Sequence, residues 1–375
     1  MPAEPRTRQP LPTSDRPLRI AHILSHTAIN GVGTSLEVLM REQHAEGHTL
    51  MLVHRPNCWL AKQLADLPVE FLEAPLHTRY RELHHVGDTI RSWRADVIHT
   101  HGSTAHKYGA IYRVAGKIPI VATAHACHFQ LHWVFNNRVI APSQITADYH
   151  HRVNRVRRRN LRIIHHAFDV TTATVATAED RATQRADLGL PQDAFVVGMT
   201  GDICRRKNQL DCVQVIAALR DRDVDAHLVL IGVGADREYV GEIRQAIEDK
   251  GLQDRVHLLG LRLDVVDLLA ALDAYLCTSI HEEGPIATLE AMARGLPIIT
   301  TRIGCMPALL GDARGGQMFE VGDNSGMADY AAELAHNPEM RRELGAAARA
   351  TIVEHLAPAA IVPQVEAVYR EVIRA

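Results

Sequence analysis

The feature that most constrains the fold is a pattern of short apolar segments, typical of buried β-strands, that alternate with helical segments. The series runs twice: one begins with a strand predicted at 18–24 and the other with a strand predicted at 195–200. Strands that alternate with helices pair in parallel and carry helices on both faces of the sheet. The chain of 375 residues also exceeds the size of most single hydrophobic cores. We therefore predict an α/β protein with two doubly wound, Rossmann-like parallel-sheet domains that face each other across a cleft.

The domain boundaries follow from changes in composition. A first segment rich in proline and arginine, without an apolar core, predicts a disordered tail that is not a signal peptide. A later polar stretch, rich in alanine and threonine, predicts an interdomain linker with a short helix. The predicted parts are the tail 1–17, a first domain 18–170, the linker 171–193, a second domain 194–357 and a C-terminal helix 358–375 that packs back on the first domain.

Residues at the carboxyl ends of the strands are candidates for a site, because ligands of parallel sheets bind there. The other strands are predicted at 48–53, 95–99, 118–123, 138–141 and 161–164 in the first domain and at 227–231, 256–259 and 274–278 in the second. His99, His101 and His125 fall at such ends, and Gly31 and Gly33 lie in a loop before a predicted helix. Packing is the better explanation for any one of these histidines, whereas the three together favour a site.

The segment around a helix predicted at 285–294 combines charges that suit a phosphorylated, hydroxyl-rich ligand. Gly284 and Pro285 mark the start of this helix, and a glycine marks its end. Glu282 precedes the helix and Glu290 lies within it, so two carboxylates bracket a helix N-terminus whose free N–H groups attract anions. Ordinary compensation of the helix dipole explains the same acids, and for this segment alone it is the better explanation.

A run of three cations, Arg205, Arg206 and Lys207, follows the strand predicted at 195–200. Lysine offers a point charge and arginine a planar fork, and both suit a diphosphate. A solvated basic turn is the alternative, but the position at a strand end favours phosphate binding.

A second basic run places Arg152, Arg155 and Arg159 at spacings of three and four residues. On a helix these arginines would share one face. That face suits an anionic membrane surface or a phosphorylated acceptor. A solubilising surface explains it equally well.

Several classes of function are disfavoured. The formal net charge of -3 gives no global field for nucleic acid. Six scattered cysteines without a Cys-x-x-Cys pair are typical of a reduced, cytoplasmic protein. No run approaches the ~18 apolar residues of a membrane span, so we expect any membrane contact to be peripheral, at the inner face. The motifs of serine hydrolases, zinc proteases and P-loop enzymes do not occur.

Together these motifs resemble those of the retaining glycosyltransferases of family four, which have the GT-B fold. Glu282 and Glu290, within HEEGPIATLEAMARGLPII, are similar to the family's paired-glutamate motif, and Lys207 is similar to its diphosphate-binding lysine. The remaining similarities are to its first-domain histidine motifs at 96–102 and 123–125, its glycine pair at 30–31 and its Asn-Gly-Val-Asp motif at 166–169.

The resemblance implies transfer of a sugar from a nucleotide-diphosphate sugar, UDP-linked in our expectation, to a hydroxyl of a glycan, lipid-linked or small-molecule acceptor. It implies no metal and no other cofactor. The implied catalytic residues are Glu282 on the transferred sugar, His125 opposite it, and Lys207 on the diphosphate. The implied donor-binding residues are Glu290 on the ribose with Arg205, Arg206, Gly31, Gly284, Pro285, Ile286 and Ala287, and the implied acceptor-side residues are His99, His101 and Gly33.

Two departures from the family pattern leave other activities open. Asp202 stands where the family commonly has arginine, and we expect Arg205 or Arg206 to compensate its charge. The segment 304–308, GCMPA, replaces the family's Gly-Gly-x-Pro-Glu pattern. The alternatives are a nucleotide-sugar epimerase on the same fold and a non-catalytic protein that binds a nucleotide-sugar.

Overall fold

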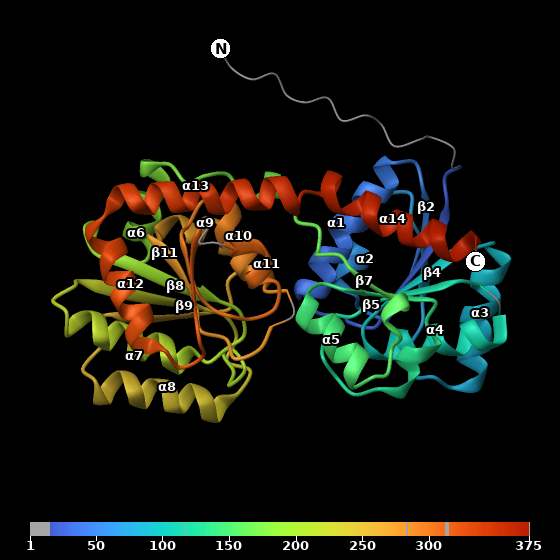
Figure 1. The fold of residues 1–375 in the computed structure, drawn as a ribbon, viewed down its shortest axis with the longest axis horizontal. Helices are drawn as coiled ribbons and strands as arrows, with labels where there is room; N and C mark the ends of the chain where they lie inside the picture. The colour runs from blue at the N-terminus through green and yellow to red at the C-terminus, as the bar shows by residue number, and fades with distance from the viewer. Residues whose placement is uncertain (1–15, 117, 283, 312–314, 375) are drawn as a thin grey trace, which may run out of the picture.

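The computed structural model describes residues 16–116, 118–282, 284–311 and 315–374. The chain forms two lobes, each built around one parallel sheet with helices on both faces (Figure 1). The first sheet has seven strands in the order β3-β2-β1-β4-β5-β6-β7. Its strands are β1 (Arg19–Leu24), β2 (Thr49–His54), β3 (Glu70–Glu73), β4 (Val97–His101), β5 (Ile120–Thr123), β6 (Arg138–Ala141) and β7 (Leu161–Ile163).

The second sheet has six strands in the order β10-β9-β8-β11-β12-β13, and all its pairs are parallel. Its strands are β8 (Phe195–Thr200), β9 (Ala226–Ile231), β10 (Val256–Gly260), β11 (Ala274–Cys277), β12 (Ile298–Thr301) and β13 (Gly316–Phe319). The predicted fold class, two doubly wound parallel-sheet domains, is therefore confirmed.

Helices cover both faces of each sheet. In the first domain they are α1 (Gly31–Ala45), α2 (Trp59–Gln63), α3 (Tyr80–Ser92), α4 (Ser103–Gly116), α5 (Gln144–Arg152) and the short 3-10 helices η1 (Leu131–Phe135), η2 (Arg158–Asn160) and η3 (Val170–Thr172). The second domain carries α6 (Ala178–Asp187), α7 (Gln209–Arg220), α8 (Arg237–Asp249), α9 (Val265–Leu268), η4 (Leu269–Ala271), α10 (Ile286–Arg294), α11 (Met306–Leu310), α12 (Asn324–His336) and α13 (Pro338–His355). The last helix is α14 (Pro358–Arg374).

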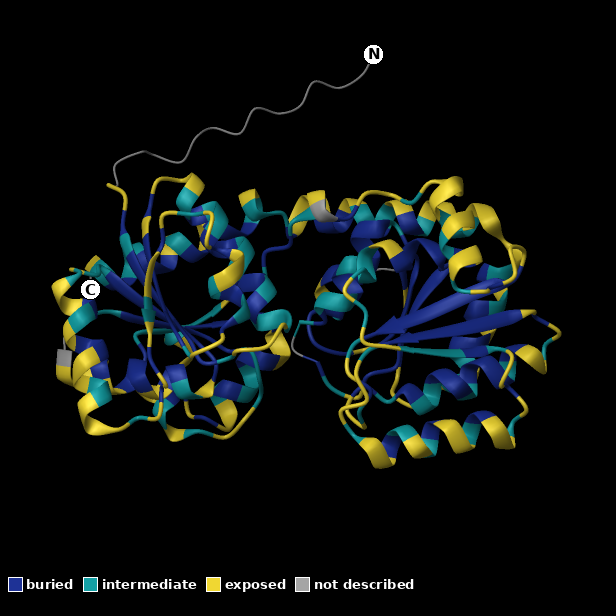
Figure 2. Cartoon of the chain, turned by 180° about the vertical axis from the view of Figure 1, so that it is seen from behind, coloured by how far each residue is buried: buried dark blue, intermediate teal, exposed yellow. Residues whose placement is uncertain are grey.

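The central strands are buried from end to end, and Figure 2 shows both sheets as the dark interior of their lobes. Strands with helices on both faces generally have sequences that are continuous apolar runs. The strand order reverses between β1 and β4 in the first sheet and between β8 and β11 in the second. A crevice forms at such a reversal, outside the carboxyl ends of the strands. The loops after these strands supply the candidate site.

The C-terminal helix α14 lies on the first domain, where it packs against α1 (Figure 1). Glu366 accepts a hydrogen bond from His48 at 2.8 Å, and Glu371 pairs with Arg138 at 2.7 Å and with Arg162 at 2.5 Å. The chain thus crosses between the domains a second time, after α13.

One sequence prediction about local structure was wrong, and two others were confirmed in part. Gly31 and Gly33 do not lie in a loop, because α1 begins at Gly31 and the Asn30 side chain caps it by accepting from the Gly33 N–H at 3.0 Å. His101 is the last residue of β4, at its carboxyl end as predicted, whereas His99 lies in the middle of that strand. The predicted linker contains the expected short helix, α6, and its Arg185 is fully buried and bonds Asp273 of the second domain at 2.6 Å.

The basic run at Arg152, Arg155 and Arg159 is not one helical face. Helix α5 ends at Arg152, Arg155 has a φ of 58°, and Arg159 lies in η2. Asn154 breaks the helix, because its side chain donates to the His128 carbonyl at 2.8 Å and accepts from the Gln130 N–H at 2.7 Å.

None of the described helices is both long enough and apolar enough to cross a bilayer. The prediction of a disordered tail falls on residues 1–15, which lie outside the described part of the chain, and on residues 16 and 17.

Candidate active site

Helix α10 forms the floor of the candidate site in the second domain. Pro285 precedes its first turn without a side-chain cap, and Gly295 ends it in the left-handed conformation with a φ of 83°. A helix without an N-cap side chain leaves its first N–H groups available, and the helix dipole makes this end attractive to an anion. The predicted helix at 285–294 is confirmed.

Lys207 and Glu282 meet in front of this helix. The Lys207 Nζ lies 2.7 Å from Glu282 Oε1, and the Arg206 Nη1 lies 2.8 Å from the same oxygen. Both Lys207 and Glu282 are about nine-tenths buried. Gly201 makes room for the lysine, since a Cβ at that position would lie 3.0 Å from Lys207 Nζ. A nearly buried cation with a single strong carboxylate partner is well placed to bind phosphate.

Glu290 lies in a different electrostatic environment. Burial raises its pKa from the ordinary value of 4.5 to about 7, and Lys207 counteracts this rise. Its carboxyl group is therefore close to half ionised at neutral pH. A carboxylate in such a site gains from hydroxyl donors that satisfy its oxygens.

The first domain reaches this floor through two close contacts between the domains. A Cβ on Gly31 would lie 2.9 Å from Cγ1 of Ile286, and a Cβ on Gly284 would lie 2.9 Å from Cδ2 of His166. His166 in turn stacks on His125 with ring centroids 5.0 Å apart. Glycine at both positions is what allows the domains to approach this closely.

Two cavities flank the contact between Gly31 and Ile286. One, of about 320 Å³, is lined by Glu282, His125 and Gly284. The other, of about 610 Å³, is lined by Glu290 and by residues of α1 and α14. Ile286 lines both. A ligand that reaches both glutamates therefore passes over the N-terminus of α10.

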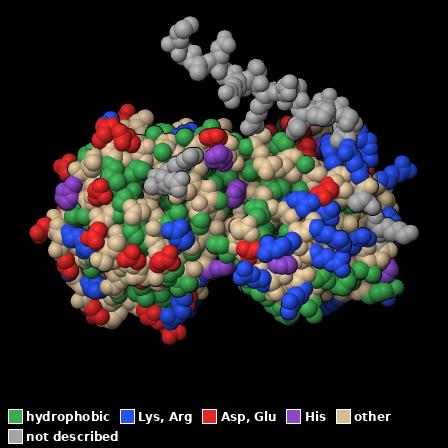
Figure 3. Space-filling view, in the orientation of Figure 1, with side chains coloured by type: hydrophobic (Ala, Val, Ile, Leu, Met, Phe, Trp, Pro, Cys, Tyr) green, Lys and Arg blue, Asp and Glu red, His purple; other side chains and the backbone are tan. Residues whose placement is uncertain are grey.

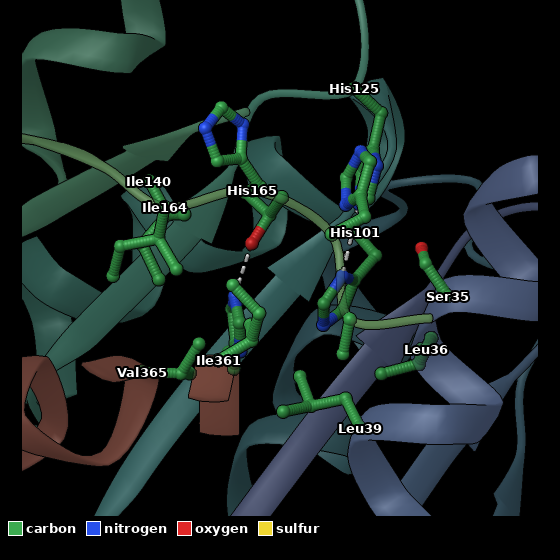
Figure 4. Close-up of a pocket in the computed structure, with 14 residues that line it drawn as sticks. Ser35, Leu36, Leu39, His101, His125, Ile140, Ile164, His165, Ile361 and Val365 are labelled. Atoms are coloured by element: carbon green, nitrogen blue, oxygen red, sulfur yellow. Dashed lines mark hydrogen bonds between the residues drawn. The ribbon is translucent and has the colours of Figure 1, made fainter. Parts of the chain in front are cut away.

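Behind His125 runs a chain of buried imidazoles. His101 Nδ1 lies 3.2 Å from His125 Nε2, and His101 Nε2 lies 3.2 Å from His22 Nδ1. His22 Nε2 lies 2.9 Å from Gln43 Oε1. Figure 4 shows His101 pointing toward His125 beside a small cavity of about 30 Å³, with Leu36 and Leu39 from α1 and Ile361 and Val365 from α14 around it.

Tyr369 of α14 fixes the far end of this chain. The Gln43 amide donates to the Tyr369 hydroxyl at 3.1 Å, which leaves the amide oxygen for His22. The same hydroxyl lies 2.6 Å from His99 Nδ1, and His99 Nε2 lies 2.7 Å from Thr123 Oγ1. His99 therefore serves the interior and not the cleft.

These hydrogen bonds determine the tautomer of each ring. Burial lowers the pKa of His22 to about 4 and holds the pKa values of His101 and His125 well below 6.5, so all three are neutral at neutral pH. A neutral imidazole has one donor and one acceptor nitrogen. Because an amide oxygen only accepts, His22 donates from Nε2, His101 donates from Nε2, and His125 donates from Nε2. The Nδ1 atom of His125 is then an acceptor.

His22, His99 and His101 also form the one group among the described residues with the spacing of a metal site, with ligand atoms within 4.8 Å of one another. No carboxylate belongs to this group, and each ring already has the hydrogen-bond partners given above. Neutral hydrogen bonding therefore accounts for its geometry.

The structure brings most of the predicted site residues together. Those that line the cleft cavities are Glu282, Glu290, His125, Arg206, Gly31, Gly284 and Ile286, with Lys207 bonded to Glu282. Pro285 and Ala287 lie at the start of α10, as predicted.

Other predicted residues lie elsewhere. Arg205 pairs with Glu242 of α8 at 2.5 Å, and its side chain is turned away from the cleft residues. A Cβ on Gly33 would lie 3.5 Å from the ring of Trp59. Neither Arg205 nor Arg206 pairs with the exposed Asp202 in the described part of the chain, so the expected compensation was wrong.

The positions of Gln43, His22 and Tyr369 in this hydrogen-bond chain were not predicted from the sequence. His22 had a detectable signal, since it is a polar residue in the middle of a buried strand. Gln43 and Tyr369 are separated by 326 residues and had none.

Comparison with known proteins places both halves of the chain in one group. A family model described as Glycosyl transferases group 1 matches residues 180–351, and one described as Glycosyltransferase Family 4 matches residues 29–172. The N-acetyl-alpha-D-glucosaminyl L-malate synthase of Bacillus anthracis is 28% identical over 291 residues, which cover 74% of this chain and 75% of that protein. The D-inositol 3-phosphate glycosyltransferase of Corynebacterium glutamicum is 28% identical over 314 residues, 80% of this chain and 72% of that protein.

Solved structures share the whole fold. Anabaena HepE in complex with UDP and glucose superposes with a TM-score of 0.82 at 20% identity and covers 94% of this chain and 99% of its own. A glycosyltransferase from Rickettsia africae has a TM-score of 0.83 at 15% identity, over 96% of this chain and 99% of its own. The arrangement of the two domains is the GT-B fold.

The imidazole chain predicts that His125 carries its proton on Nε2. Nitrogen chemical shifts of [15N]histidine-labelled protein are expected to show this tautomer in the native protein. Replacing Tyr369→Phe or Gln43→Leu removes the group that orients the chain, so His125 is expected to become a mixture of tautomers in both variants.

His165 is the internal control, because its Nδ1 donates to the Pro142 carbonyl at 2.7 Å, outside the chain. Its tautomer should stay the same in all three proteins. A proton on Nδ1 of His125 in the native protein would contradict the assignment.

Proposed function

Because the chain belongs to glycosyltransferase family 4, we propose that it moves a sugar from a UDP-sugar to a hydroxyl of a glycan, lipid-linked or small-molecule acceptor. The observation that carries this proposal is the bond between Lys207 and Glu282 at 2.7 Å, in front of α10 and in a cavity shared with His125. The HepE complexes with UDP and with UDP-glucose support the choice of nucleotide.

Each group then has a separate partner on the donor. The diphosphate competes with Glu282 for Lys207 and receives the N–H groups at the start of α10. Glu290 accepts from the ribose hydroxyls. One oxygen of Glu282 is released to the hydroxyls of the transferred sugar, and His125 approaches that sugar from the first domain.

We propose a retaining, metal-independent reaction. The bond from the anomeric carbon to the diphosphate breaks as the acceptor oxygen bonds the same carbon on the same face, and the acceptor proton passes to the departing diphosphate oxygen. Lys207 and the helix N-terminus take up the charge that develops on the leaving group. No separate general base enters this scheme.

The first prediction concerns donor affinity. Replacing Lys207→Ala or Glu290→Ala is expected to weaken binding of the UDP-sugar about tenfold to a hundredfold, as for loss of a hydrogen bond to a charged group of ~1.5–3 kcal/mol. Calorimetry with a panel of nucleotide-sugars measures this. Arg205→Ala is the matched control, because Arg205 is bonded to Glu242 and its loss should leave affinity unchanged.

Unchanged affinity in both Lys207→Ala and Glu290→Ala would refute the site.

Product analysis of the native protein separates the possible activities. An epimerase would convert the UDP-sugar without an acceptor, and a non-catalytic binding protein would leave it intact in every acceptor pool. Transfer that needs an acceptor supports the proposal.

The second prediction concerns pH. Glu290 has a pKa raised to about 7, and the ribose hydroxyls donate to its ionised form. Below pH 7 the ligand must first displace a proton, so donor affinity is expected to fall by up to about tenfold per pH unit as the pH is lowered. In Glu290→Gln, affinity should be lower and nearly independent of pH. An equally steep pH profile in Glu290→Gln would show that another group titrates.

A second property is favoured by the surface of α4, η1 and α5. Trp133 of η1 is buried between His106 of α4 and His150 of α5, with ring centroids 4.3 Å from each, so these elements are neighbours. Around it large apolar side chains are exposed, with Leu131 at 69% and Phe129 at 62%. Apolar side chains exposed together often mark an interaction surface.

The charge of this region is also one-sided. Between residues 97 and 168 the sequence has ten lysines and arginines and a single acid, Asp148. Figure 3 shows Lys and Arg side chains gathered on the lobe that carries α4 and α5. We propose that this surface contacts an anionic membrane, with the apolar side chains in the interface and the arginines on the headgroups.

The third prediction tests this contact by co-sedimentation with anionic and neutral vesicles. Binding is expected only with anionic vesicles, and both the Arg152→Glu, Arg155→Glu, Arg159→Glu variant and the Phe129→Ser, Leu131→Ser variant are expected to lose it. The control is charge reversal at Asp329, which pairs with Arg222 and lies on α12 of the other domain. Binding that survives charge reversal would refute this placement.

A further inference from the structure

A cavity of about 820 Å³ lies in the second domain, away from the cleft. It is bounded by α6, by the turn from α10 to β12 and by α13. Asp273 immediately precedes β11 and Pro297 immediately precedes β12, so the cavity lies at the amino ends of the strands. The candidate active site lies at the opposite, carboxyl ends.

The lining of this cavity is strongly cationic. Its charged residues are Arg181, Arg294, Arg341, Arg342, Arg349 and Asp273. Asp273 is already engaged, because it bonds Arg181 at 3.0 Å and the buried Arg185 at 2.6 Å. Five arginines therefore line a cavity whose single carboxylate is neutralised by Arg181 and Arg185 and lies 3.9 Å from Arg341 Nε.

Backbone carbonyls hold three of these guanidinium groups in place. Arg294 Nη1 donates to the Thr174 carbonyl at 2.8 Å, Arg349 Nη1 to the carbonyls of Ala173 and Ala293, and Arg341 Nη1 to those of Leu334 and Ala335. Each of these bonds uses one nitrogen of a group that has five N–H donors. The remaining donors are held rigidly, which lowers the entropic cost of binding an anion.

Arg294 supplies a second, independent observation. Its side chain is only 7% exposed, and its Nε has no hydrogen-bond partner among the described residues. An unsatisfied buried donor typically costs ~1–3 kcal/mol. Tethering of the segment at 173–174 accounts for Nη1, whereas the buried Nε has no partner among the described residues.

We propose that this arginine-lined cavity, defined by Arg181, Arg294, Arg341, Arg342 and Arg349, binds a small oligophosphate anion at a site separate from the donor site. Its volume is in the range of small-molecule pockets. The excess of cations favours an anion with two or more phosphate groups over a single phosphate. Val175, Leu296 and Val353 add an apolar wall for an organic part of the ligand.

The site shares α10 with the active site. Arg294 is one helical turn beyond Glu290, so one end of this helix meets the cavity and the other end meets the cleft. The inference does not depend on the proposed sugar transfer, because anion binding is measured without a reaction.

The test is calorimetry of the full chain carrying Lys207→Ala, which weakens anion binding at the donor site. Tripolyphosphate is expected to bind this protein saturably, and orthophosphate at least about tenfold more weakly. In this Lys207→Ala background, a second substitution, Arg294→Gln or Arg342→Gln, should lower tripolyphosphate affinity about tenfold, as expected for loss of one charge-assisted bond. Arg342 is exposed and bonds only Glu339 among the described residues, so its replacement should not affect folding.

Arg222→Gln is the matched control, since Arg222 bonds Asp329 on another surface of the same domain and should leave affinity unchanged. Comparing ATP with tripolyphosphate separates a nucleotide, which would gain from the apolar wall, from an inorganic oligophosphate. The proposal is overturned if tripolyphosphate does not bind the Lys207→Ala protein, or if Arg294→Gln and Arg342→Gln leave its affinity unchanged.

Discussion

The return of α14 to the first domain is the constraint on which the cleft depends. The chain leaves the first domain after β7, builds the second sheet, and comes back through α13 and α14. Glu371 secures the return by pairing with Arg138 and Arg162, which hold the pKa of its carboxyl below the ordinary value. Tyr369 secures it from inside, in contact with Gln43 and His99. Two crossings restrict the domains more than one would, and the glycine contacts in the cleft need that restriction.

The two glutamates at α10 show how one residue type serves two purposes. Glu282 is paired with Lys207 and Arg206, and this pairing holds the lysine in the cleft. Glu290 has no cation in bonding contact in the described part of the chain, and burial raises its pKa to about 7. Glu282 therefore balances the charge of Lys207, whereas the oxygens of Glu290 can accept hydrogen bonds from donors on a ligand. The two carboxyl groups have the same chemistry, and their different neighbours give them different roles.

Much of this arrangement could be predicted from sequence because it depends on local signals. Proline and glycine mark both ends of α10, and the cations of 205–207 lie in the loop between β8 and α7. Other features depend on distant contacts. The helix α5 stops at Arg152 because Asn154 bonds the backbone near residues 128–130, and no local pattern reveals that bond. The strand β3, with the sequence EFLE, is an exposed edge strand without the alternation that would identify it.

The neutral state of the buried histidines suits the charge that would develop in the proposed reaction. Glycosyl transfer develops positive charge at the anomeric carbon, and a protonated imidazole beside that carbon would oppose it. Desolvation keeps His125 neutral, and the chain from Gln43 through His22 and His101 directs a proton to its Nε2. The remaining ring nitrogen, Nδ1, then carries a lone pair. Because Tyr369 orients Gln43, helix α14 also determines which ring nitrogen of His125 carries the proton.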